Sequence, residues 1–156
     1  MVLVNSQPIP STSINVKGVV DWVDKYLDGT PFGCRLYDAQ KRALFKILNE
    51  FSLRRHVSGI LQLPTGAGKT ICVAALALAL YRLGILREGS ILLYLTPRIV
   101  LKEQVENKFE DIFSNLSKDG LRFFRIEKPR EKIIDRLRFF LEVWGEDRVL
   151  VLIITP

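Results

Sequence analysis

The residues best suited to chemistry stand together in one segment, LPTGAGKT, at positions 63–70. Gly66 and Gly68 permit a tight backbone turn whose N–H groups point inward, with no Cβ to block an approaching phosphate. Lys69 supplies a positive charge for β- and γ-phosphates, and the Thr70 hydroxyl is a suitable Mg²⁺ ligand. The segment therefore predicts a loop that binds a triphosphate. Its predicted binding residues are Pro64, Thr65, Gly66, Ala67, Gly68, Lys69 and Thr70.

The elements on either side of this loop are those that must position it. Residues 59–63 form a short apolar run, which suits a buried strand. Residues 70–83 are rich in Ala and Leu and predict a buried helix that ends at Gly84. Strand, loop and helix in this order are the context that a phosphate-binding loop requires, and the helix start adds a partial positive charge.

The chain beyond the loop continues to alternate between the two kinds of element. Strands are expected at 91–96, 121–126 and 149–155, and helices from Pro97 to about residue 113 and over 129–144. Unbroken apolar strands alternating with helices indicate an α/β fold, in which a parallel sheet is sandwiched by helices. Only Pro156 follows the last strand, so we expect the domain to be incomplete at its C-terminus.

Before the loop, the sequence predicts helices only. Apolar residues at helical spacing indicate one helix over 14–27 and another over 37–54. The DGTPFG stretch at 28–33 separates the two, because Gly and Pro favour turns. The first helix therefore reads as part of a short N-terminal extension.

Composition limits the classes of protein that remain. The chain has 156 residues, 48% of them hydrophobic, and a formal net charge of +6. This apolar content is enough for a core and excludes global disorder. Cys34 and Cys72 are too few for a disulfide framework, and the only histidine, His56, argues against a His-based metal site or a Ser-His-Asp triad. No run approaches the roughly 20 apolar residues that cross a bilayer, so we expect a cytoplasmic protein without a membrane partner.

Residues 64–70, PTGAGKT, resemble motif I of the superfamily 2 helicases and translocases, which include the DEAD/DEAH and type III restriction enzymes. In this superfamily TGxGKT is usual and the outer Gly of the strict phosphate-loop pattern, here Leu63, is commonly absent. The segment at 96–104 resembles motif Ia of the same superfamily. The matching residues there are Pro97, Arg98, Leu101 and Gln104.

A third likeness lies upstream, where residues 36–40, LYDAQ, resemble the LRxYQ element that precedes motif I. Leu36 and Gln40 agree with that element, whereas Tyr37 and Ala39 replace its Arg and Tyr. Together the likeness covers residues 35–156 in the right order. It implies a partial RecA-like P-loop domain there, preceded by a lead-in with one helix at residues 1–34.

The resemblance also implies roles for individual residues. Gln40 hydrogen-bonds the adenine edge, which makes ATP with Mg²⁺ the expected cofactor, and Lys69 and Thr70 are the catalytic residues. Arg98 contacts the backbone of a nucleic acid, DNA or RNA, with a single strand as the expected form. The second RecA-like domain, which supplies the arginine finger, is missing from this chain.

One motif of the superfamily does not occur in the sequence. No Asp-Glu-x-His or Asp-Glu-x-Asp follows Lys69, so the domain is expected to stop before its Walker B motif and to hydrolyse almost no ATP alone. Two alternatives stay open. The chain could be a non-catalytic module that binds nucleic acid or a helicase through Arg98 and the basic region at 121–140. It could also be a P-loop enzyme of another family, such as a kinase.

Overall fold

The computed structural model describes residues 15–53, 57, 59–86, 90–95, 99–113, 116 and 150–154. The strand expected at 121–126, the helix expected at 129–144, His56, Arg98 and the basic region at 121–140 lie outside these residues. The described residues as far as Ile85 form one compact part, here called the helical part. Those from Leu86 onward form another, here called the strand part.

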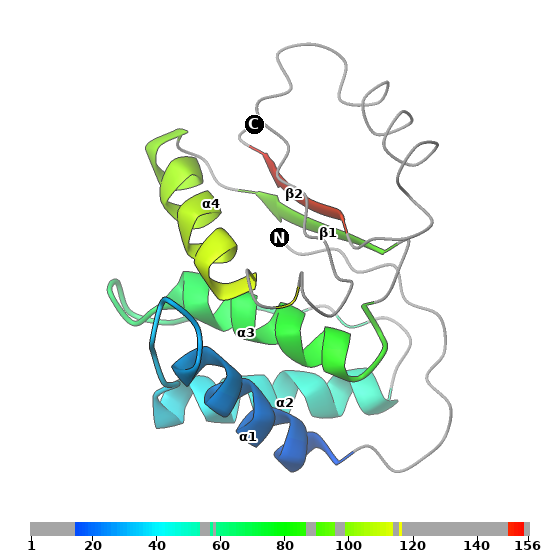
Figure 1. Ribbon diagram of the computed structural model, residues 1–156. Helices are drawn as coiled ribbons and strands as arrows, with labels where there is room; N and C mark the ends of the chain where they lie inside the picture. The colour runs from blue at the N-terminus through cyan, green and yellow to red at the C-terminus, as the bar shows by residue number, and fades with distance from the viewer. Residues whose placement is uncertain are drawn as a thin grey trace. The chain divides into compact units, whose positions relative to one another are not determined.

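The helical part consists of α1 (Val16–Asp28), α2 (Asp38–Leu53) and α3 (Lys69–Arg82) (Figure 1). Helix α1 packs against both α2 and α3, and α2 packs against α3. The predicted helices at 14–27, 37–54 and 70–83 are therefore confirmed, with ends shifted by at most two residues. The structure places the phosphate-loop segment between α2 and α3.

Helix α1 has clear start and stop signals and one apolar stripe. The Asn15 side chain accepts a hydrogen bond from the Gly18 N–H at 2.9 Å, which caps the first turn, and Gly29 is the C-cap residue. Buried residues at three- and four-residue spacing form the stripe that faces the other helices. They are Val16, Val20, Val23 and Leu27.

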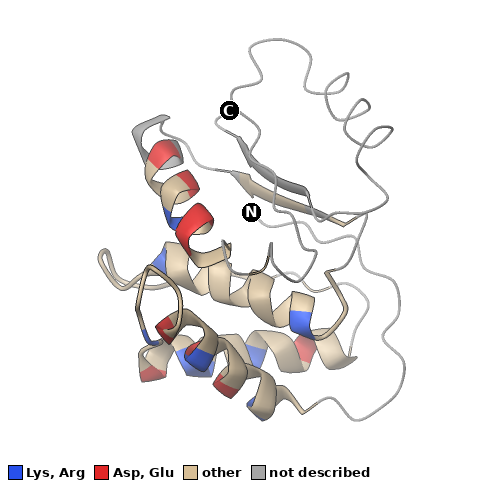
Figure 2. Ribbon diagram, in the orientation of Figure 1, with Lys and Arg blue, Asp and Glu red and all other residues tan. Residues whose placement is uncertain are grey.

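Helix α3 is the buried centre of the helical part. It carries charge only at its ends, Lys69 and Arg82, as Figure 2 shows. Most of the residues between them are buried, which confirms the predicted buried helix, and Cys72 is one of these core residues. The Arg82 guanidinium lies 5.3 Å from the centre of the Trp22 ring on α1.

The strand part holds β1 (Ile91–Leu95), α4 (Ile99–Phe113) and β2 (Leu150–Ile154). The two strands pair in parallel, in register from one end of each to the other. Tyr94 of β1 meets Phe109 of α4 edge to face at 5.8 Å. The predicted strands at 91–96 and 149–155 and the helix ending at 113 are confirmed. The described residues contain this one parallel pair, and the larger helix-covered sheet stays a prediction.

The prediction of a strand at 59–63 is wrong. These residues have irregular backbone, with Ile60 98% exposed and Leu61 38% exposed. A β-strand is stabilised by hydrogen bonds to a neighbouring strand, and the described residues of the helical part contain no such neighbour. An apolar run shows a tendency to be buried but does not specify its pairing partner.

None of the described helices is long and apolar enough to cross a membrane.

Candidate phosphate-binding site

The backbone of the loop before α3 turns at two glycines. Gly66 has φ +85° and Gly68 has φ +74°, both in the left-handed region that strains residues with a Cβ. The Ala67 N–H donates to the Pro64 carbonyl at 3.2 Å and closes the turn. Both glycines are thus required by the backbone conformation that the structure shows.

Helix α3 starts directly behind this turn without a side-chain cap. Gly68 occupies the N-cap position and makes no side-chain hydrogen bond there. No acidic residue stands in the first turn of α3. The first N–H groups of a helix have no partner within it and carry partial positive charge, so this end suits an anion.

The two polar side chains of the first turn lie differently. Lys69 is exposed, and its Nζ donates to the Pro64 carbonyl at 3.2 Å, so the ammonium folds back across the loop. Thr70 is half-buried one residue further along α3. Thr65 and Gly66 are exposed, and a Cβ built at Gly66 would meet nothing within 4 Å. The loop therefore has open space on the side of Gly66 and a cation within reach.

Gln40 lies beside the loop, 27 residues away in sequence. Its Nε2 donates to the Ala67 carbonyl at 2.9 Å, and its Oε1 accepts from the Tyr37 N–H at 2.8 Å. The residue is only 3% exposed. A Cβ built at Gly68 would lie 2.5 Å from this Nε2. The structure thus brings Gln40 and the loop together, whereas its contact with adenine stays a prediction.

The cysteine on α3 does not add a thiolate to the site. Cys72 is buried, and burial raises the pKa of its thiol above the ordinary value. It therefore stays protonated near neutral pH and brings no negative charge close to a bound phosphate.

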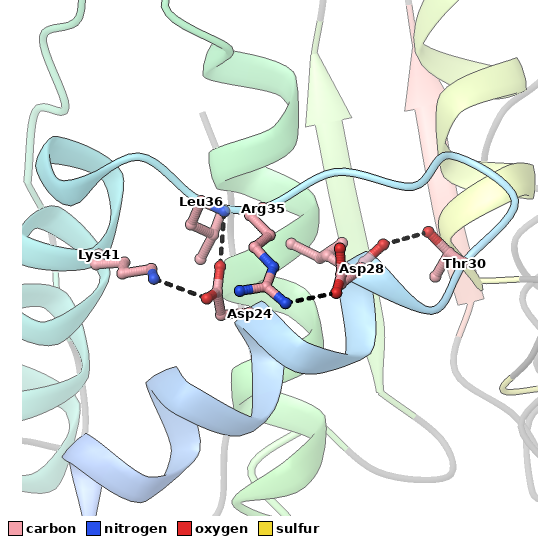
Figure 3. A network of polar contacts seen from close by, with 7 residues as sticks. Asp24, Asp28, Thr30, Arg35, Leu36 and Lys41 are labelled. Carbon is pink, nitrogen blue, oxygen red and sulfur yellow. Dashed lines mark hydrogen bonds and ion pairs between the residues drawn. The ribbon is translucent and has the colours of Figure 1, made fainter.

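A polar network fixes the connection that leads to Gln40 (Figure 3). The Asp24 carboxylate on α1 accepts from Lys41 Nζ at 2.7 Å and from the Leu36 N–H at 2.7 Å. Asp28 pairs with Arg35 at 2.8 Å, and this hydrogen bond lowers the pKa of the Asp28 carboxyl. Sequence reasoning missed this network, because helical spacing says nothing about partners that are 12 or 17 residues apart.

The one residue predicted to contact nucleic acid, Arg98, belongs to the motif Ia likeness. Arg98 lies outside the described residues. Gln104, the last residue of the motif Ia likeness, is exposed on α4 in the strand part. Helix α4 carries more acidic than basic residues, which is visible in Figure 2.

Comparison with protein-family models matches residues 33–143 to the family described as type III restriction enzyme, res subunit. The matched range contains Gln40, the loop, α3, β1 and α4. No curated protein and no solved structure matches the chain.

Proposed function

Because the chain belongs to the type III restriction enzyme res subunit family, we propose that it is the ATP-binding portion of an ATP-dependent nucleic-acid helicase or translocase. In this proposal residues 35–156 form part of a RecA-like domain whose parallel sheet is covered by helices. Residues 1–34 form a lead-in whose helix, α1, packs against α2 and α3.

The observation that carries the proposal is the shape of the loop at the uncapped start of α3. Two left-handed glycines turn the backbone there, no carboxylate stands in the first turn, and Lys69 lies across the loop. These features fit a triphosphate, because they combine N–H donors, a helix N-terminus and a point charge.

We propose a role for each of the predicted site residues. The backbone from Pro64 to Gly68 binds the phosphates, and Lys69 neutralises the charge of the β- and γ-phosphates. The Thr70 hydroxyl holds Mg²⁺, which when bound would shield the charge on the phosphate oxygens. Gln40 belongs to the same nucleotide site through its contact with Ala67.

We further propose a nucleic acid, DNA or RNA in single-stranded form, as the partner of the whole enzyme, with Arg98 contacting its backbone. ATP binding would close this domain against a second RecA-like domain. The chain lacks the acidic motif that orients the attacking water. Alone, it therefore binds ATP weakly and hydrolyses almost none.

Replacement of Lys69 tests the phosphate site. Lys69→Met and Lys69→Ala should each weaken ATP binding about 10-fold or more, because a charge-assisted contact to phosphate is lost. Isothermal titration calorimetry with Mg·ATP measures the change. Lys46→Met removes the same charge from an exposed position on α2 and is the control. Unchanged ATP affinity in both Lys69 variants, with Lys46→Met also unchanged, would contradict the proposal.

A further inference from the structure

The side-chain amide of Gln40 is held at both ends by the chain itself. Its Oε1 accepts from the N–H of Tyr37, the residue just before α2. Gln40 is the third residue of α2, so this bond is the reciprocal half of a capping box. Because the Tyr37 N–H can only donate, the amide oxygen must face it, and Nε2 must then face the loop.

The other end of the amide meets the backbone where the loop turns. Nε2 donates to the Ala67 carbonyl, between Gly66 and Gly68. It comes so close to Gly68 that a Cβ there would lie 2.5 Å away. The contact therefore fixes one carbonyl of the peptide chain whose N–H groups would receive a phosphate.

We propose that Gln40 is a positioning residue, which holds the Ala67–Gly68 backbone in its phosphate-binding shape whatever base the nucleotide carries. The inference rests on the proposed function. At 3% exposure, with both polar atoms engaged, the side chain offers little to an incoming base edge. Its effect is exerted on the triphosphate end of the ligand, through the backbone.

This role and a base-reading role predict different patterns of affinity. If Gln40 shapes the loop, its loss weakens the binding of ATP, GTP and inorganic tripolyphosphate by the same factor. The size of one lost hydrogen bond suggests about 3- to 10-fold. If Gln40 hydrogen-bonds the adenine edge, only the binding of ATP is weakened, because GTP and tripolyphosphate do not present that edge.

Two variants separate the two ends of the amide. Gln40→Glu keeps an oxygen for the Tyr37 N–H but places the other oxygen against the Ala67 carbonyl, so the helix cap survives and the loop contact is lost. Gln40→Ala removes both bonds. Gln62→Glu introduces the same charge at an exposed residue before the loop and controls for repulsion of phosphate.

The full chain is titrated calorimetrically with Mg·ATP, Mg·GTP and tripolyphosphate, and thermal melting by circular dichroism confirms folding. Amide hydrogen exchange without ligand is the second readout. The inference is supported if Gln40→Glu lowers the affinity for all three ligands by the same factor, and by more than Gln62→Glu does. Amide hydrogen exchange in Gln40→Glu should then be faster at residues 66–69 and unchanged in α1.

Three results would overturn the inference. A loss confined to ATP assigns Gln40 to the base, and unchanged affinities or unchanged loop exchange in Gln40→Glu remove its role altogether. If the unmodified chain binds none of the three ligands, the proposed function itself fails and the inference fails with it. That last result is distinct, because it requires no variant.

Discussion

Gly66 and Gly68 have the same left-handed backbone but different surroundings. The position of a Cβ at Gly66 is open, whereas one at Gly68 would lie 2.5 Å from the Gln40 amide. The two glycines therefore separate the cost of backbone strain from the cost of displacing Gln40.

Substitution of each glycine by Ala tests this difference. Both Gly66→Ala and Gly68→Ala should lower the free energy of unfolding by about 1–2 kcal/mol through left-handed strain. Gly68→Ala should lower it further, because the Gln40 amide must move. Urea denaturation of the two variants measures the difference, and equal losses would show that the Gln40 contact adds nothing.

At this scale the sequence predicts the loop residues well and their partner poorly. The chemistry of Gly66, Gly68 and Lys69 is local, so residue type and spacing are enough. Gln40 could be linked to the site only through a family likeness, and its bond to Ala67 joins residues 27 apart. Such a pairing depends on how α2 packs, which no local pattern specifies.

The connection between α1 and α2 depends on two carboxylates that differ in burial. Asp24 is 15% exposed and accepts from Lys41 and from the Leu36 N–H. Asp28 is 45% exposed and meets only the more exposed Arg35 among the bonds that the structure gives for its side chain. We infer that Asp24, rather than Asp28, holds the start of α2 in place.

Alanine substitution of each aspartate tests this inference. Asp24→Ala should lower the free energy of unfolding by about 1–3 kcal/mol, because a largely buried backbone N–H and an ammonium lose their acceptor. Asp28→Ala should change it little, since an exposed ion pair is well solvated. Urea denaturation at pH 7 measures both, and a larger loss in Asp28→Ala would contradict the assignment.

The sign of any pH effect from Asp28 follows from its bond to Arg35. That bond lowers the pKa of Asp28 below the ordinary value of 3.8. The stabilisation is therefore fully present above that value and is lost as the pH falls through the lower pKa of the folded state.

Among the elements, those with strong periodicity were predictable and the run at 59–63 was not. The spacing of apolar residues in α1 and α2 specifies a helix independently of what packs against it. The length of the apolar run in α3 does the same. A five-residue apolar run specifies burial at most, and in the structure Ile60 is 98% exposed. Within α2 the buried residues include the polar Gln40, whereas the apolar Ala39 is exposed.

The net charge of +6 belongs to the whole chain and is unevenly distributed. Helix α4 carries an excess of acidic residues, whereas the sequence places a basic cluster at 121–140. We expect nucleic-acid affinity to come from Arg98 and that cluster. Counterion release would make such binding depend strongly on salt.

A filter-binding or anisotropy titration with single-stranded DNA and RNA tests this expectation. Arg98→Gln should weaken binding on all sequences and reduce the salt slope by about one. Arg42→Gln, at an exposed position on α2, is the control and should have no effect. The chain should show almost no ATPase activity with or without nucleic acid.

The response to ATP distinguishes the remaining alternatives. Nucleic-acid affinity that changes when ATP is added supports a helicase portion. Salt-dependent binding that ignores ATP favours a non-catalytic module instead. No binding to either nucleic acid would contradict the proposed partner.

For the molecule as a whole, the motifs predicted the family that the comparison shows over residues 33–143. They could do so because phosphate chemistry constrains a few neighbouring residues tightly. The number of strands in the sheet and their order depend on contacts between distant segments. From the described residues, only the parallel pairing of β1 with β2 is established.

The contact between Trp22 and Arg82 gives the protein a built-in optical probe. The indole lies 5.3 Å from the guanidinium at the far end of α3 from the loop, and 5.3 Å from the Tyr26 ring. With Trp144, the second of the two tryptophans, replaced by Phe, all indole emission would come from this one place. The wavelength and quenching of this emission would then report, without any attached dye, whether α1 stays docked on α3 when ATP is added to the protein.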